Sequence, residues 1–193
     1  MRIHGNGLVR VAARLALVVL AIVSVDACAA VVDARLTRIG DDVVIEASAT
    51  VNADGATAWR VLTDYARYRN FIPGVRASRV LARHGSSVVV EQSDEVAVWR
   101  ARFPVRVTYE IAEFPPRELR SFAKAPPLPS LSSTFELTNT DTGVRIDYVG
   151  RVESTFAPLG RLLQPIVEQT AIRDLEALAA EIERRSGAPR GNG

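Results

Sequence analysis

Few residues of this 193-residue chain are of the types that perform chemistry. It contains two histidines, His4 and His84, and one cysteine, Cys28. A Ser/His/Asp arrangement needs a histidine beside a nucleophile, whereas His84 lies in a segment, residues 83–86, with the composition of an exposed turn. A metal site needs paired histidines, cysteines or an Asp-rich loop, and the sequence has none of these. We therefore expect no catalytic residues of these kinds, no metal and no cofactor.

Two arginines on one predicted strand have two possible orientations. Arg100 and Arg102 alternate with apolar residues. Pointing inward, their guanidinium groups would hold a carboxylate or phenolate by paired hydrogen bonds. Pointing outward, they would pair with Glu91 or Asp94 of the neighbouring strand, and we favour this arrangement because exposed cross-strand pairs are common.

The acidic residues form no evident catalytic pair. General acid–base catalysis needs two carboxyl groups aimed at one point. Nothing in the sequence forces two of the strand carboxylates onto one inward face; these are Glu91, Asp94, Glu95 and Glu136. We therefore expect a protein that is not an enzyme, with catalysis as the alternative.

Two tyrosines are candidates for orienting a ligand. Tyr148 shares one strand face with Val144, Ile146, Gly150 and Val152, and this apolar set should face the core. Its hydroxyl would then lie in an apolar hollow and either orient a ligand oxygen or bond to the backbone. Tyr109, on the strand 105–114, has the same character. Gly150 in mid-strand indicates a bend or a close approach of a helix.

The first elements that must position these side chains are a strand and two short helices. Residues 43–51 alternate apolar and polar side chains, which predicts a strand. Asn52 or Asp54 can cap a helix that runs to about residue 62. Asp64 can cap a second short helix that ends near residue 71, where Pro73 and Gly74 stop it.

The remaining elements are predicted to be antiparallel strands and one long helix. The strands are expected at residues 75–82, 87–94, 96–103 with 105–114 (one long strand interrupted at Pro104), 118–125, 131–138 and 144–154, the last two around a loop at 139–143. Apolar residues then recur at helical spacing over 159–185; they are Leu162, Leu163, Ile166, Val167, Ile172, Leu175, Leu178, Ala179 and Ile182. Charged residues, Glu181 among them, should lie on the outer face of this helix. The order predicts an α+β domain in which a curved antiparallel sheet of about seven strands surrounds the C-terminal helix.

The N-terminal segment has the pattern of a signal peptide. Three arginines precede an apolar run at 15–23, and small residues follow at 27–29. We expect residues 1–29 to be cleaved, and the mature protein to be exported, to the periplasm. A lipid anchor at Cys28 is the less favoured alternative, because Asp26 fits a lipoprotein signal poorly. We divide the rest into a lead-in (30–42), a ligand-binding domain (43–185) and a disordered tail (186–193).

The charge balance argues against nucleic acid as a partner. The whole chain has 24 basic and 22 acidic residues, of which the leader holds three arginines and one aspartate. The remainder is therefore balanced at 21 of each sign. Nucleic-acid-binding proteins normally carry a basic stripe, so we exclude that class.

Three segments resemble a known superfamily. They are residues 61–75, with the run Asp-Tyr-x-x-Tyr-x-x-Phe-x-Pro-Gly-Val; residues 78–81; and the strand pair 131–152, with Phe135, Asp147 and Tyr148. Together with the last helix, they resemble the START-like, helix-grip superfamily, and most of all its polyketide cyclase / coenzyme Q-binding START-domain family. The resemblance implies a sheet that grips the last helix around a hydrophobic cavity. Members bind lipids, isoprenoid quinones or aromatic polyketides, and most have no catalysis assigned.

This resemblance leads to a functional hypothesis. We expect an exported carrier or binding protein for a hydrophobic small molecule, with a polyketide aromatase/cyclase as the alternative and an envelope interaction module as a third option. The loop 125–130, rich in proline, would either touch a membrane transiently or act as a rigid connector. The sequence leaves the oligomeric state open. As the ligand-binding residues we predict Leu62, Phe71, Ile72, Trp99, Tyr109, Phe135, Tyr148, Ile166 and Thr170.

Overall fold

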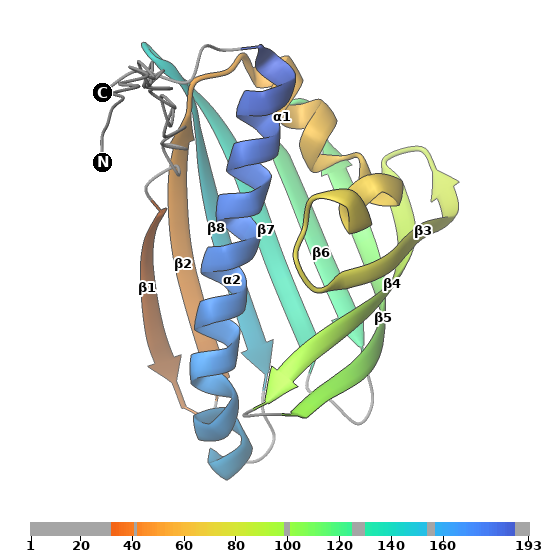
Figure 1. The fold of residues 1–193 in the computed structure, drawn as a ribbon, viewed down its shortest axis with the longest axis vertical. Coiled ribbons are helices and arrows are strands. Elements are labelled where there is room, and N and C mark those ends of the chain that lie inside the picture. Colours follow the sequence, from red (N-terminus) through yellow and green to blue (C-terminus); the bar gives the residue numbers. More distant parts are fainter. Residues whose placement is uncertain (1–31, 41, 99–100, 125–129, 154–156, 188–193) are drawn as a thin grey trace, which may run out of the picture.

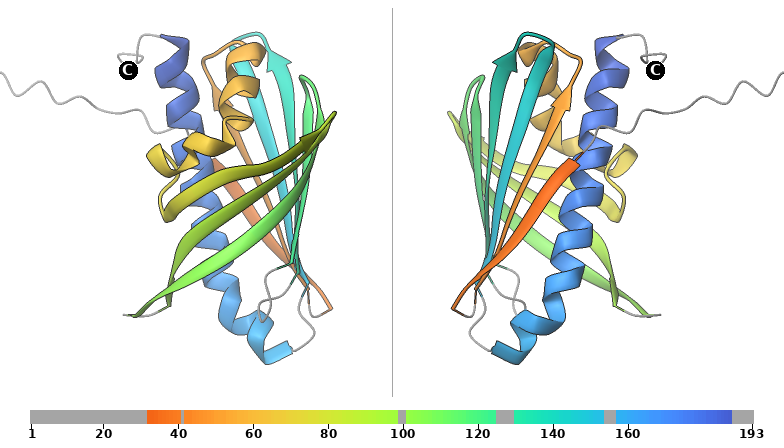
Figure 2. Two further views of the ribbon diagram at one scale, coloured as in Figure 1. Left: turned by 90° about the vertical axis from the view of Figure 1, so that its right-hand side faces the viewer. Right: turned by 90° about the vertical axis from the view of Figure 1, so that its left-hand side faces the viewer.

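A computed structural model describes residues 32–40, 42–98, 101–124, 130–153 and 157–187. The predicted leader with Cys28, Trp99 and Arg100, most of the loop 125–130 and the end of the tail lie outside these residues. The described chain forms one antiparallel sheet with the strand order β1-β2-β8-β7-β6-β5-β4-β3. The sheet is curved, and a long helix lies across its concave side (Figures 1 and 2). The predicted α+β helix-grip fold is confirmed.

The elements follow the predicted order. The strands are β1 (Val32–Ile39), β2 (Asp42–Val51), β3 (Val75–His84), β4 (Ser87–Val98), β5 (Ala101–Phe114), β6 (Glu118–Lys124), β7 (Ser130–Thr140) and β8 (Gly143–Glu153). The helices are α1 (Gly55–Leu62), the short 3-10 helix η1 (Tyr65–Asn70) and α2 (Ala157–Ser186). Strands β3 to β8 form a meander, and β8 pairs with β2.

The sheet has one more strand than the seven expected. Strand β1 lies within the segment 30–42 that we predicted to be a lead-in, and it pairs with β2 over its whole length, from Val32 opposite Ala49 to Ile39 opposite Asp42. The sequence signal for β1 is weak because most of its side chains are exposed at the edge of the sheet. Without a buried face, a strand shows little apolar alternation.

The predicted strand 96–103 is wrong. Strand β4 continues to Val98, β5 begins at Ala101, and these two residues are register partners, so the chain reverses between them. The two residues between them in the sequence, Trp99 and Arg100, are not among the usual turn residues glycine, asparagine and proline. Pro104 is paired with Glu95 in unbroken register, and among the described residues β6 joins the other side of β5 only from Thr108. Pro104 therefore lies at an edge position, one of the two placements predicted for it.

One of the two predicted helix caps is present and the other is not. Asp54 caps α1, because its carboxylate accepts a hydrogen bond from the Thr57 backbone N–H at 2.7 Å and from the Thr57 hydroxyl at 2.8 Å. Asp64 precedes η1 but its side chain makes no cap hydrogen bond. Its carboxylate instead accepts from the Arg185 guanidinium of α2 at 2.7 Å. The prediction that Asp64 caps the second helix is therefore wrong.

The core lies between the concave face of the sheet, α1 and the C-terminal part of α2. Figure 2 shows α1 in the space between sheet and α2 at one end of the fold. Inward residues of β8 and the predicted inner face of α2 meet there, and the fully or almost fully buried members are Val144, Ile146, Leu175, Leu178, Ala179 and Ile182. Burying this apolar surface stabilises the fold by about 25 cal/mol per Å² removed from water. No described helix combines the length and the apolar character that crossing a membrane requires.

One predicted surface charge is buried. Glu181 was expected on the outer face of α2 but is only 8% exposed. It pairs with two arginines of the following turn, at 2.6 Å from Arg184 Nε to Oε2 and 2.6 Å from Arg185 Nε to Oε1. These hydrogen bonds, that from Arg184 first, lower the pKa of Glu181. The two paired arginines let a carboxylate lie at the edge of the core.

The face assignment of β8 can be tested with one pair of substitutions. Ile146→Ala should lower the free energy of unfolding by about 2–5 kcal/mol, because it removes a fully buried side chain and leaves a cavity. Val149→Ala on the opposite face, where the side chain is 44% exposed, should change it by less than about 0.5 kcal/mol. Urea titrations followed by circular dichroism measure both, and equal losses would contradict the assignment.

Candidate functional site

Aromatic side chains gather on the concave face where β7 and β8 pair. Phe135 lies opposite Tyr148 in the register, and their ring centroids are 4.7 Å apart with the planes tilted by 47°. The Tyr148 ring lies over Gly150 of its own strand, because a Cβ at Gly150 would stand 2.4 Å from the tyrosine hydroxyl oxygen. Gly150 thus makes room for a ring. The bend or close helix predicted for this glycine stays a prediction.

Tyr109 of β5 adds a second hydroxyl to this face. It shares its inward face with Val107 and Ile111, and it packs against both apolar clusters of the protein. Within the described part of the chain, no hydrogen bond links the hydroxyl of Tyr109 or Tyr148 to another residue. Burial raises the pKa of Tyr109, and the Asp94 charge adds to the rise; burial likewise raises the pKa of Tyr148 to about 12. Both tyrosines are therefore neutral hydroxyl groups at physiological pH.

Two carboxyl groups from different elements contribute to the raised pKa values of these tyrosines: Asp94 and Asp174 act on Tyr109, and Asp174 acts on Tyr148. Asp94 comes from β4 and Asp174 from α2, and each is half-buried. Burial, the largest cause, and the nearby Asp174 charge raise the pKa of Asp94 to about 7 against the opposing effect of Arg173. Burial raises the pKa of Asp174 to about 6, again opposed by Arg173. At neutral pH, Asp94 is therefore partly protonated, whereas an ordinary aspartate would have lost its proton.

Gly74 contacts both α2 and β4, through Arg173 and Glu95. Arg173 donates from Nε and Nη2 to Asp174 Oδ1, at 3.1 and 2.9 Å. A Cβ at Gly74 would lie 3.2 Å from Arg173 Nη2, so the guanidinium rests on the glycine. The Gly74 carbonyl accepts from the Glu95 backbone N–H at 2.9 Å. The residue next to Asp94 and the residue next to Asp174 therefore meet at one point.

The acid pair was missed in the sequence, although a partial signal existed. Asp94 continues the inward alternation of Val88, Val90 and Gln92, all of which are buried. Asp174 lies four residues before Leu178, on the buried side of α2. Each residue could have been placed on an inward face, but their proximity depends on how α2 crosses the sheet, which periodicity does not encode.

The segment that carries η1 is locked onto the far end of β5. Tyr65 is almost fully buried and donates its hydroxyl to Glu113 Oε1 at 2.9 Å. Arg83 Nη1 donates to the other oxygen, Oε2, at 2.8 Å. Tyr68 donates to the Leu62 carbonyl at 2.5 Å, and its ring packs edge-on against Tyr65 and Phe71. These bonds hold η1 against α1 and the sheet.

The structure separates the predicted ligand-binding residues into three groups. Tyr109, Phe135 and Tyr148 come together on the concave face, half-buried, and Thr170 is half-buried on α2. Leu62 and Ile72 are enclosed in the packed core, while Phe71 lies at its edge, under the Arg185 guanidinium at 5.5 Å. Trp99 and the side chain of Ile166 lie outside the described residues, as do Arg100 and the side chain of Arg102 with their two predicted orientations.

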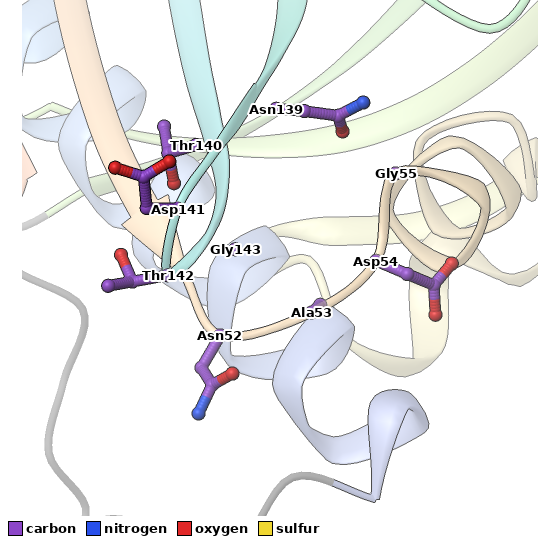
Figure 3. A pocket seen from close by; sticks show the side chains of 9 residues that line it. All are labelled: Asn52, Ala53, Asp54, Gly55, Asn139, Thr140, Asp141, Thr142 and Gly143. Carbon is purple, nitrogen blue, oxygen red and sulfur yellow. The ribbon is translucent and has the colours of Figure 1, made fainter.

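Two surface hollows lie away from the concave face. The first is polar and is formed where the start of α1 meets the β7–β8 turn; Figure 3 shows Asn139 reaching toward Gly55 across it. The Asp54 carboxylate beside it is occupied by its helix cap. The second lies mainly on the outer face of the sheet, and among its lining residues are Ile39, Val44, Thr134, Val149 and Arg151. Among the described residues, no cluster of three or more His, Cys, Asp or Glu side chains could hold a metal ion.

The role of Gly150 can be tested by a single methyl group. Gly150→Ala should displace the Tyr148 ring, because the added Cβ would overlap its hydroxyl and ring carbons. We expect changed aromatic NMR signals of Tyr148 and Phe135 and a loss of about 1–3 kcal/mol in the free energy of unfolding. Gly40→Ala controls for the NMR readout: its added Cβ meets nothing within 4 Å, but its backbone at φ +64° is strained by any side chain, so it should cost stability without moving the Tyr148 signals. Tyr148 signals that stay unchanged in Gly150→Ala would contradict the packing described here.

Several solved structures have a similar architecture. The Zhui aromatase/cyclase from Streptomyces sp. R1128 superposes with a TM-score of 0.65 at 20% identity, over 75% of this chain and 95% of that chain. A STAR-related lipid transfer protein (fragment 25–204) from Xanthomonas axonopodis gives 0.62 at 15% identity, over 78% and 93%. A START superfamily protein from Mycobacterium smegmatis gives 0.52 at 16% identity, over 75% and 97%.

These likenesses, all at low identity, show a shared fold. A sequence search among curated proteins finds no match. The sequence model of the family described as polyketide cyclase / dehydrase and lipid transport matches residues 42–187, which include every described element except β1. The chain therefore belongs to this family of the START-like superfamily.

Proposed function

We propose that this protein is an exported carrier that holds a hydrophobic small molecule between the sheet and α2. The observation that carries the proposal is the state of the inward aromatic residues. Tyr109, Phe135 and Tyr148 face the helix side but are only half-buried, whereas inward residues nearer α1, such as Ile146, are fully buried. Apolar side chains that stay partly uncovered on an inward face are suited to a ligand.

The chemistry of this face favours an apolar ligand with few polar contacts. Apolar contact would supply most of the affinity, at about 25 cal/mol per Å² buried, less the costs of association. The hydroxyls of Tyr109 and Tyr148 would set the orientation. The family description includes lipid transport, and the similar Xanthomonas axonopodis structure is named a STAR-related lipid transfer protein. A leader over residues 1–29 would place the carrier outside the cytoplasm, and N-terminal sequencing of the mature protein, expected to begin near residue 30, tests that part.

A bulky side chain on the concave face provides the test of binding. Ser133 of β7 is half-buried opposite Gly150, on the inward face that Leu137 continues, and its neighbour Ser132 has the opposite orientation along the strand. The protein purified from its own host should release an apolar compound on solvent extraction, detected by mass spectrometry. Ser133→Trp should reduce the amount at least tenfold, and Ser132→Trp should leave it unchanged. Repeated absence of any apolar compound from the wild type would refute the carrier proposal.

An aromatase/cyclase is the second candidate, and the acid pair favours it. A carboxyl group with a pKa near 7 can give or take a proton at neutral pH. Asp94, at about 7, and Asp174, at about 6, lie near two tyrosine hydroxyls that would position a folding chain. The Zhui protein of similar fold is an aromatase/cyclase. The proposed export argues against this candidate, because polyketide chains are made in the cytosol.

The raised pKa values predict a pH dependence of stability. Between about pH 4 and 7, the folded protein binds a proton at Asp94 that the unfolded chain has lost, so this group makes the free energy of unfolding fall as pH rises. Asp94→Asn should remove this contribution, which is of the order of 1 kcal/mol or more. The variant should therefore be more stable than the wild type at pH 8 and lose that advantage toward pH 4, as measured by urea unfolding at several pH values. A constant difference between the two proteins would contradict the assigned titration.

A further inference from the structure

One carboxyl oxygen on the concave face lacks a partner. Asp94 Oδ1 is buried, and no hydrogen bond reaches it from the described residues. Neighbouring polar groups are engaged elsewhere: Arg173 binds Asp174, and the Gln92 amide donates to the Ser78 hydroxyl at 3.4 Å. An unsatisfied buried polar atom costs free energy, so folded proteins rarely keep one without a reason.

The surroundings of Asp94 combine apolar walls with hydroxyl groups. Val105 is its register partner on β5, and Tyr109 lies further along the same inward face. The charge of Asp94 contributes to the raised pKa of the Tyr109 hydroxyl, and Asp174 acts on both Tyr109 and Tyr148. The unpartnered oxygen therefore belongs to the same face as the proposed ligand site and forms its polar end.

We propose that Asp94 binds the hydroxyl group of the ligand, which is therefore an apolar alcohol or phenol. This inference rests on the proposed binding function and narrows its ligand class. A ligand O–H would donate to Asp94 Oδ1 and so satisfy an acceptor that the described residues leave open.

A hydroxyl fits this position better than other polar groups. Asp94 titrates near neutral pH, and a hydroxyl can donate to the carboxylate as well as accept from the carboxylic acid. A carboxylate ligand would be repelled by Asp94 and Asp174. An ammonium group would be disfavoured by the neighbouring guanidinium of Arg173, which acts on the same carboxyl group. A fully apolar compound would leave the buried oxygen unsatisfied.

A matched pair of probes tests the inference. 1-Naphthol and 1-methoxynaphthalene share one ring system, but only the first can donate a hydrogen bond. Binding of each to the full chain is measured by isothermal titration calorimetry at pH 7. We expect naphthol to bind about tenfold more tightly, the lower range for one hydrogen bond to a charged group. Asp94→Ala and Asp94→Val should reduce this ratio to about one without weakening the methoxy compound.

The control is another aspartate on a strand. Asp147 of β8 is bound to Arg145 at 2.8 Å on the outer face, so Asp147→Ala should keep the tenfold ratio. Loss of a buried, unpartnered acid should not destabilise the fold, and circular dichroism verifies this for both Asp94 variants. Equal affinity of the wild type for the two probes, or a ratio that survives both Asp94 substitutions, would overturn the inference while leaving the carrier proposal intact. Binding of neither probe nor any extracted apolar compound would overturn both.

Discussion

The apolar concave face of the sheet has a single long helix to cover it, and most of the structure follows from this constraint. Eight strands are wider than one helix, so α2 can seal only part of the face. At one end, α1 and η1 complete the cover, held by the bonds from Tyr65 and Arg83 to Glu113 and by the Arg185–Asp64 ion pair. Toward β5, β7 and β8, inward aromatic residues remain partly uncovered. The proposed binding face is thus the part of the concave side that α1, η1 and α2 do not cover.

The charged groups of this partly covered face lie along β4. Asp94 comes from that strand, and Arg173 and Asp174 come from α2. Arg173 neutralises Asp174 at short range, but no group among the described residues bonds to Oδ1 of Asp94. A carrier that relied on apolar contact alone would gain stability by replacing such a group with an aliphatic one. The presence of the Asp94 carboxyl is explained if it binds a polar group of the ligand. This reasoning favours selective binding over general storage of apolar compounds, and it applies equally to a carrier and to a cyclase.

Much of the fold could be predicted from local patterns, because each strand or helix with one buried face shows its period in the sequence. The meander, the Asp54 cap and the inward face of β8 were predicted in this way. Strand β1 was missed because its side chains are largely exposed, and the reversal between Val98 and Ala101 because it lacks turn residues. The site was only partly predictable. Tyr109 and Tyr148 follow from alternation, but the meeting of Asp94 with Asp174 depends on the crossing of α2 over the sheet, a relation between residues 80 positions apart.

The contact between the Tyr148 ring and Gly150 has a consequence for how this sequence can evolve. The ring occupies the space of the missing Cβ, so the two positions are not independent. A chain that first acquires a side chain at 150 loses the ring's place on the strand, and one that first loses the ring leaves a void beside Phe135. Drift should therefore change both positions together or neither, and homologues with a small residue at 148 should be the ones free of glycine at 150. Such co-variation would record a ligand face that has been remodelled as one unit.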